Sequence, residues 1–243
     1  MASNETINMH SKKKKTYFTP NEIKATKNFE VQDLSRDFIE KIDYIDYPCV
    51  GAKSAINTNQ FRFGIYGLMG TEETTEALGS DLKKYIEETI SANSNYMSMI
   101  AIFKDKIESE FDFENKLWSQ LQALYNSEKN EQAWDKSVGS NPEENDFSFS
   151  FGGTAFFIVG LHPHSSRRSR RFKHSALAFN LHRQFEQLRD KDLYEKMKQT
   201  IRNREIEYDG SINPMLKDHG KGLEAPQYSG RKVGKNWKCP FQL

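Results

Sequence analysis

Three short, almost purely apolar runs limit what this chain can fold into. They are residues 96–103, 156–161 and 176–180. Each run is shorter than a typical helix, and apolar side chains at nearly every position fit a strand that is covered on both faces. Residues 60–68 add a strand in which Phe61, Phe63 and Ile65 alternate with other residues. A sheet built from such strands needs helices on both sides, so the sequence predicts an α/β (α+β) fold.

The segments between these runs have the period of amphipathic helices. Leu78, Leu82, Ile86 and Ile90, for example, recur every four residues. Helices are therefore expected at residues 33–45, 71–91, 113–125, 181–189 and 192–204, with a further helix start at Pro20. Residues 47–53 are expected to form a loop, and Asn180 is expected to cap the helix that follows it.

The chain of 243 residues shows no internal repeat and no dividing linker. We therefore expect a single domain over residues 19–243, with a central mixed sheet flanked by helices. Residues 1–18 are polar and rich in lysine, and this composition predicts a disordered tail.

The composition restricts the classes of function. Lys and Arg number 35 against 34 Asp and Glu, so the net charge of +1 gives no overall attraction to nucleic acid or to a membrane. No run of 18 apolar residues could form a spanning helix, and no apolar stretch follows the lysines near the N-terminus as in a signal peptide. Two cysteines are too few for a secreted disulfide framework. We expect a cytoplasmic protein.

The densest polar cluster directly follows the run at residues 156–161. It spans residues 162–174 and reads His-Pro-His-Ser-Ser-Arg-Arg-Ser-Arg-Arg-Phe-Lys-His. Polar groups that follow a buried strand are typical of the ligand-binding edge of an α/β sheet. Guanidinium groups bind carboxylates or phosphates, and Phe172 keeps part of the cluster apolar. The cluster is either an anion site or a solvated basic loop that pairs with the acidic residues of 126–145.

Three residues are candidates for binding a metal. His162 and His164 are two positions apart, which on a strand points both side chains to the same side. They could bind a non-haem metal, or one could ligate haem, or both could be ordinary loop histidines. Cys49 could supply a thiolate ligand or be an inert buried thiol.

His182 and Glu186 are a candidate catalytic pair. They are four positions apart on an expected helix, so they share one of its faces. The same spacing is common in surface pairs without a catalytic role, and the sequence leaves both interpretations open.

Several short motifs together resemble the YqcI/YcgG family over about residues 30–243. They occur in the order expected for that family. They are Pro48-Cys49-Val50-Gly51-Ala52-Lys53, Gly160-Leu161-His162-Pro163, Ser165-Ser166-Arg167 with Arg170-Arg171-Phe172, Asn180 with His182 and Gln184-Phe185-Glu186, Gly210-Ser211-Ile212-Asn213-Pro214-Met215, Gln227-Tyr228-Ser229-Gly230-Arg231 and Cys239-Pro240-Phe241.

The resemblance implies a haem-dependent oxygenase that hydroxylates a guanidine nitrogen of arginine or an arginine-like compound. His162 would ligate the iron of haem b, with His164 and Cys49 as alternatives. The cofactor would lie against Arg167, Arg170, Arg171, Phe172, Tyr228 and Arg231, with arginines on its propionates. The substrate would contact Glu186, Glu224 and Asn213, and His182 and Glu186 would be catalytic. Electrons would come from an external donor, and a homodimer is left open.

Two other functions remain open at this point. One is a non-haem iron oxygenase that uses His162, His164 and a carboxylate. The other is a haem-binding or stress protein without turnover. Nucleic-acid binding through the arginines is not expected, because the charges balance and no reader motif is present.

Overall fold

A computed structural model describes residues 15–218 and 220–243. Its centre is a six-stranded sheet with the strand order β1-β2-β3-β6-β5-β4. Strands β2 and β3 are parallel and all other neighbouring pairs are antiparallel, so the sheet is mixed, as predicted. The strands are β1 (Tyr17–Phe18), β2 (Phe61–Tyr66), β3 (Ser98–Phe103), β4 (Phe149–Phe151), β5 (Thr154–Leu161) and β6 (Ser175–Leu181).

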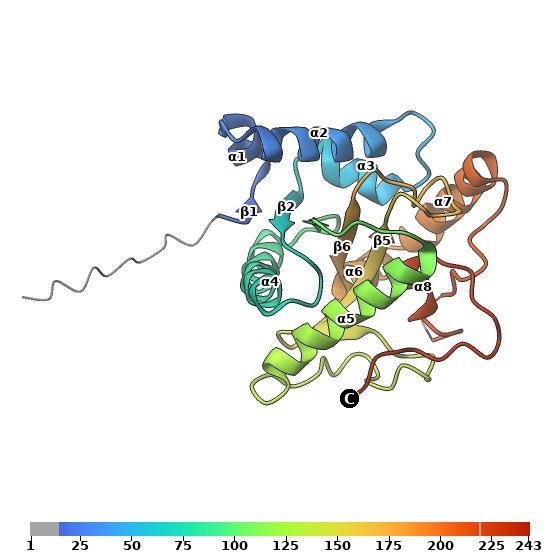
Figure 1. The fold of residues 1–243 in the computed structure, drawn as a ribbon. Helices are drawn as coiled ribbons and strands as arrows, with labels where there is room; N and C mark the ends of the chain where they lie inside the picture. Colours follow the sequence, from blue (N-terminus) through green and yellow to red (C-terminus); the bar gives the residue numbers. More distant parts are fainter. Residues whose placement is uncertain (1–14, 219) are drawn as a thin grey trace, which may run out of the picture.

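Helices cover the two faces of this sheet. Figure 1 shows α2 and α3 on one side of it, with α7 beyond them, and α4 and α5 on the other side. The described helices are α1 (Pro20–Ala25), α2 (Phe29–Asp43), α3 (Val50–Asn57), α4 (Glu72–Ala92), α5 (Glu110–Glu128), α6 (His182–Asp190), α7 (Tyr194–Asp209) and α8 (Pro226–Ser229). The single α+β domain with a central sheet is thereby confirmed, and the five periodic segments are all helical.

The alternation of side chains along the strands produces two separate cores. On β3, Met99 and Ala101 pack toward α4 and α5, whereas Ile100 and Ile102 pack toward α2. The same period of two recurs on β5 and β6, because successive side chains of a strand point to opposite faces. Each central strand is therefore apolar at almost every position, which is the pattern that the sequence displays.

Two sequence-based boundaries are wrong in the structure. The expected tail reached residue 18, but Tyr17 and Phe18 are buried and pair with Phe63 and Gly64 at the edge of the sheet. Burial of these two aromatic side chains contributes more free energy than ordering this part of the chain costs. Residues 1–14 of the expected tail lie outside the described residues.

The expected loop at residues 47–53 ends earlier than predicted, because α3 begins at Val50. Cys49 is its N-cap, and the Cys49 Sγ accepts a hydrogen bond from the backbone N–H of Ala52 at 3.4 Å. Asn180 is not a cap either. It continues β6, and Gln184 Oε1 accepts the N–H of Leu181 instead. Strand pairing with Phe157 outweighs the capping preference of asparagine.

Gly160 lies where β5 is in close contact with α5 and α8. A Cβ at this position would lie 2.5 Å from a ring carbon of Phe113 and 2.7 Å from the carbonyl oxygen of Tyr228. The sheet, α5 and α8 meet at this point, and a side chain larger than that of glycine would collide with them.

We expect Gly160→Ala to lower the free energy of unfolding by about 1–3 kcal/mol, because the methyl group meets a backbone oxygen and a buried ring. Urea unfolding measures this change. The control is Gly234→Ala, where nothing lies within 4 Å of the added Cβ. Equal stabilities for both variants would contradict the packing described here.

Candidate functional site

A cavity of about 270 Å³ lies on the side of the sheet that α2, α3, α6 and α7 cover. Its volume is near the lower end of the range for small-molecule sites. Its floor is one face of the sheet, formed by Ile100, Val159, Leu161 and Ala178. Further apolar side chains come from the helices, among them Phe38, Ala52, Ile56, Leu188, Met197 and Ile201. Most of the cavity surface is thus apolar, with polar groups at a few points.

Cys49 is one of these polar points. Of the three candidate metal ligands, only Cys49 lines the cavity. Its sulfur lies at the N-terminus of α3, where backbone N–H groups favour a thiolate. Burial acts in the opposite direction and raises the pKa of the thiol, so Cys49 is protonated at neutral pH in the free protein.

His182 is a second donor on the cavity wall. It is the first residue of α6 and is 4% exposed. Its Nδ1 lies 3.9 Å from Glu186 Oε1, one turn further along the helix. The predicted pairing of these two residues on one helical face is therefore correct. Glu186 itself is exposed, does not line the cavity and also pairs with Arg189, so it can only act through His182.

Helix α7 contributes a complete face to the cavity. Tyr194, Met197, Lys198, Ile201, Arg202 and Glu205 all line it. Lys198 and Arg202 are held by Asp218, which also lies on the wall. Glu205 is buried, and burial raises the pKa of its carboxyl although the nearby Arg167 acts to lower it. Glu224 lies on the wall too, and its Oε1 accepts a hydrogen bond from the Tyr228 hydroxyl at 2.7 Å.

His162 lies outside this site. Because Leu161 faces the cavity, the period of two puts His162 on the opposite side of the sheet. The imidazole is 1% exposed and stacks on the Phe113 ring, with 4.3 Å between ring centroids. Neither ring nitrogen has a hydrogen-bond partner among the described residues. Burial lowers the pKa of His162 to about 4. His164 is exposed and does not line the cavity.

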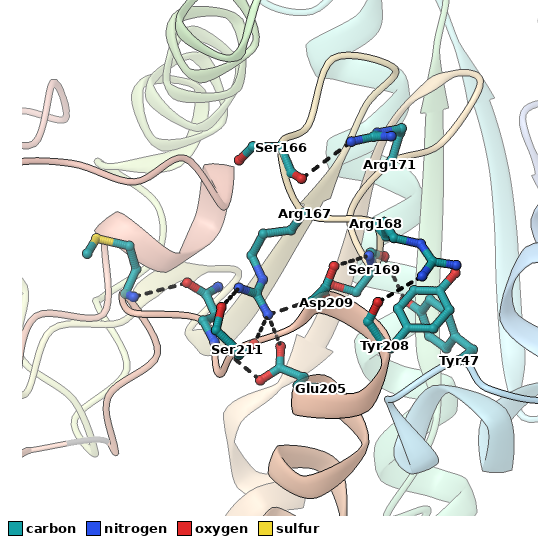
Figure 2. A network of polar contacts seen from close by, with 12 residues as sticks. Tyr47, Ser166, Arg167, Arg168, Ser169, Arg171, Glu205, Tyr208, Asp209 and Ser211 are labelled. Atoms are coloured by element: carbon teal, nitrogen blue, oxygen red, sulfur yellow. Dashed lines mark hydrogen bonds and ion pairs between the residues drawn. The ribbon is translucent and has the colours of Figure 1, made fainter.

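The arginines of residues 162–174 are mostly occupied by protein partners. Figure 2 shows Arg167 between Glu205, Asp209 and Ser211, with its Nη2 3.2 Å from Asp209 Oδ2. Arg168 donates to the carbonyl oxygen of Tyr208, and Arg171 to that of Ser165. The contacts of Arg167 and Arg168 hold the β5–β6 connection to the C-terminal part of α7, and that of Arg171 lies within the connection. These arginines are held by those partners and not by the acidic residues of 126–145, with which the sequence predicted that they could pair.

Arg170 is the member of this cluster that reaches the cavity. Its guanidinium is buried and donates to the carbonyl oxygens of Gly160, Gln227 and Tyr228 at 3.2–3.4 Å. Burial lowers the pKa of Arg170, while the Glu205 carboxylate acts to raise it. Arg170 therefore places a positive charge in the cavity wall, and its hydrogen bonds position the segment around α8.

Four other predicted contacts lie behind the wall rather than on it. Phe172 packs edge-to-face against Phe38, which does line the cavity. Tyr228 is fully buried, and Arg231 forms an ion pair with the buried Glu114. The backbone N–H of Asn213 donates to Glu205 Oε2 at 3.5 Å. These residues position the site and do not line it.

Two observations bear on whether haem fits this site. The cavity wall carries two donors that ligate haem iron in proteins, the Cys49 sulfur and the His182 imidazole, within apolar surroundings. His162 cannot ligate a group in the cavity, because the sheet lies between them. The donor set therefore fits haem through Cys49 or His182. No group of three or more His, Cys, Asp or Glu side chains in the described part of the chain could hold a metal ion.

Sequence reasoning missed the contribution of α7, although a signal was present. Lys198 and Arg202 are four positions apart on the same face as Met197 and Ile201. That spacing places two cations beside an apolar stripe. Only the docking of α7 against α3 and α6 shows that this face looks into a cavity.

The fold is an α+β domain with a largely apolar cavity between the sheet and a helical layer. The sequence profile of the YqcI/YcgG family matches residues 38–242. The chain is 30% identical over 207 residues to uncharacterized protein YqcI of Bacillus subtilis (strain 168), which covers 80% of each chain. It has the same identity and coverage with uncharacterized protein YcgG of that strain. The chain therefore belongs to the YqcI/YcgG family.

No solved structure matches the chain. No helix in the described residues is long and apolar enough to cross a membrane.

The buried His162 predicts a specific pH dependence of stability. Its folded pKa is about 4, below the ordinary value of about 6.5 for an unfolded histidine. Between these pH values the unfolded chain binds more protons, so acidification destabilises the fold, by up to about 1.4 kcal/mol per pH unit.

We expect His162→Phe, which retains the stack on Phe113, to lose this part of the pH dependence. Urea unfolding at pH 7, 6, 5 and 4.5 measures it. The exposed His164→Gln is the control and should follow the unmodified protein. A His162→Phe variant that is equally sensitive to acid would show that His162 is not buried in its neutral form.

Proposed function

We propose that this chain is a haem-dependent oxygenase that hydroxylates a guanidine nitrogen of a small amino-acid-like substrate in the cavity beside Cys49. The observation that carries the proposal is the pairing of a thiol and an imidazole on the wall of one apolar cavity, in a chain of this family. The family resemblance supplies the reaction. A cytoplasmic location, an external electron donor and a homodimer belong to the same proposal.

When bound, haem b would supply dioxygen chemistry, in which one oxygen atom goes to nitrogen and the other leaves as water with two electrons and two protons. Cys49 would hold the iron, since α3 presents its sulfur to the cavity among backbone N–H groups. His182, supported by Glu186, would hold or move a proton beside the substrate.

The buried carboxylates of Glu205 and Glu224 would bind the guanidinium end of the substrate. Both lie on the cavity wall. A guanidinium group pairs well with a carboxylate in apolar surroundings because its planar donors match the two oxygens. Asn213 would act on Glu205 through its backbone, not on the substrate.

The volume of the cavity also limits the size of the ligand that it can hold. About 270 Å³ accepts an amino-acid-sized molecule as the cavity stands, but a porphyrin occupies more. Binding of haem therefore requires the wall to open, and the contact of α7 with residues 211–218 includes the ion pairs of Lys198 and Arg202 with Asp218.

We expect protein from haem-supplemented cells to show a strong Soret band at near-stoichiometric haem. Cys49→Ala should shift the band of the reduced carbon-monoxide complex and lower haem retention at least ten-fold, because the thiolate ligand is lost. His182→Ala should keep the haem and lose turnover of arginine. His162→Phe should keep both, because His162 faces the other side of the sheet.

Other outcomes of these experiments would support a competing function or end the haem proposal. A normal spectrum in Cys49→Ala with loss of haem in His182→Ala would make His182 the ligand. Bound haem without hydroxylation of any guanidine compound under reducing, aerobic conditions would leave a haem-binding protein without turnover. Iron retained without haem would point to a non-haem oxygenase, and a colourless protein that cannot be reconstituted would end the haem proposal.

A further inference from the structure

Two cations of α7 meet one carboxylate at the cavity wall. Lys198 and Arg202 are one helical turn apart and both line the cavity. Asp218 comes from the segment before α8 and bridges them. Its Oδ2 lies 3.2 Å from Lys198 Nζ, and its Oδ1 lies 3.2 Å from Arg202 Nη2.

The guanidinium of Arg202 is only partly used by this arrangement. Asp218 bonds to Nη2 alone, through one oxygen. The Nε of Arg202 is buried and has no hydrogen-bond partner among the described residues. A buried donor without a partner costs free energy, and a carboxylate normally engages a guanidinium with two parallel hydrogen bonds. Arg202 therefore has an unfilled position for a second acceptor oxygen.

We propose that Lys198 and Arg202 form a subsite for a carboxylate group of the ligand in the cavity, and that Asp218 occupies it until the ligand binds. The inference deepens the proposed function and rests on it for the identity of the cavity as the ligand site. In this proposal Lys198 and Arg202 bind the anion. Arg167 and Arg171 do not, because both are paired with protein groups elsewhere.

The charges explain why Asp218 would have to leave. Lys198 also pairs with Glu195 at 2.7 Å, so the two cations already face two carboxylates. A third carboxylate would leave one negative charge in excess in a half-buried position, which is unfavourable. The side chain of Asp218 is 22% exposed, so it can return to solvent as the ligand carboxylate takes its two cations.

Two sources could supply the carboxylate, a haem propionate or the α-carboxylate of an amino acid. Each source has a matched probe in which the carboxylates are neutral. Haemin is compared with haemin dimethyl ester, and L-arginine with L-argininamide. Dissociation constants come from Soret titration for the first pair and from the shift of the unfolding temperature for the second.

We expect Arg202→Gln and Lys198→Gln to weaken binding of the carboxylate-bearing member of one pair by about ten-fold or more, and to leave its ester or amide unchanged. Asp218→Asn should strengthen binding of the same probe, because it removes the competing carboxylate. Lys196→Gln is the matched control. It removes one positive charge from the exposed side of the same helix and should change nothing.

Several results would overturn the subsite. One is an unchanged preference for acid over ester or amide in both glutamine variants. Another is an equal loss in Lys196→Gln, which would indicate only long-range charge. Failure of every carboxylate-bearing probe to bind the unmodified protein would also overturn it. The absence of a Soret band, with a carboxylate preference retained for arginine, would reject the haem proposal and keep the subsite. Circular dichroism of each variant confirms that it is folded.

Discussion

The buried guanidinium of Arg170 holds together the parts of the protein that make the site. It donates to three backbone carbonyl oxygens, one on β5 and two in α8. Hydrogen bonds from a charged donor contribute about 1.5–3 kcal/mol each, and their loss would leave buried acceptors unpaired. The C-terminal segment has no amphipathic period of its own. It is ordered because this arginine, together with the buried Tyr228, ties it to the sheet.

The same cation also acts on the electrostatics of Cys49 and Glu205. Both line the cavity near Arg170, and both have a raised pKa because burial disfavours their charged forms. The arginine lowers these pKa values, acting against burial. Arg167 supports it from behind by pairing with Glu205 and Asp209 (Figure 2). Arg170 thus forms part of the cavity wall, and Lys198 and Arg202 of α7 add two further cations to it.

Most of the fold could be predicted from residue patterns, and part of the site could too. The period of two in the strands and of about four in the helices gave the layers, because each element buries one or both faces. His182 and Glu186 were correctly placed on one face for the same reason. The position of His162 relative to the cavity could not be predicted, even though the strand period was visible. Leu161 and His162 must point to opposite sides of the sheet, and only the structure shows which side has the cavity.

The sequence by itself determined the class of the fold, the buried strands, the main helices and the membership of the family. These follow from local periods and from short motifs, which need no knowledge of distant contacts. The tertiary structure decided which polar residues meet. Lys198, Arg202 and Asp218 come together, as do Cys49, Arg170 and Glu205, because α3 and α7 pack on one side of the sheet and the segment before α8 reaches the same cavity. Docking depends on the packing of whole faces, and a pattern within one segment does not contain it.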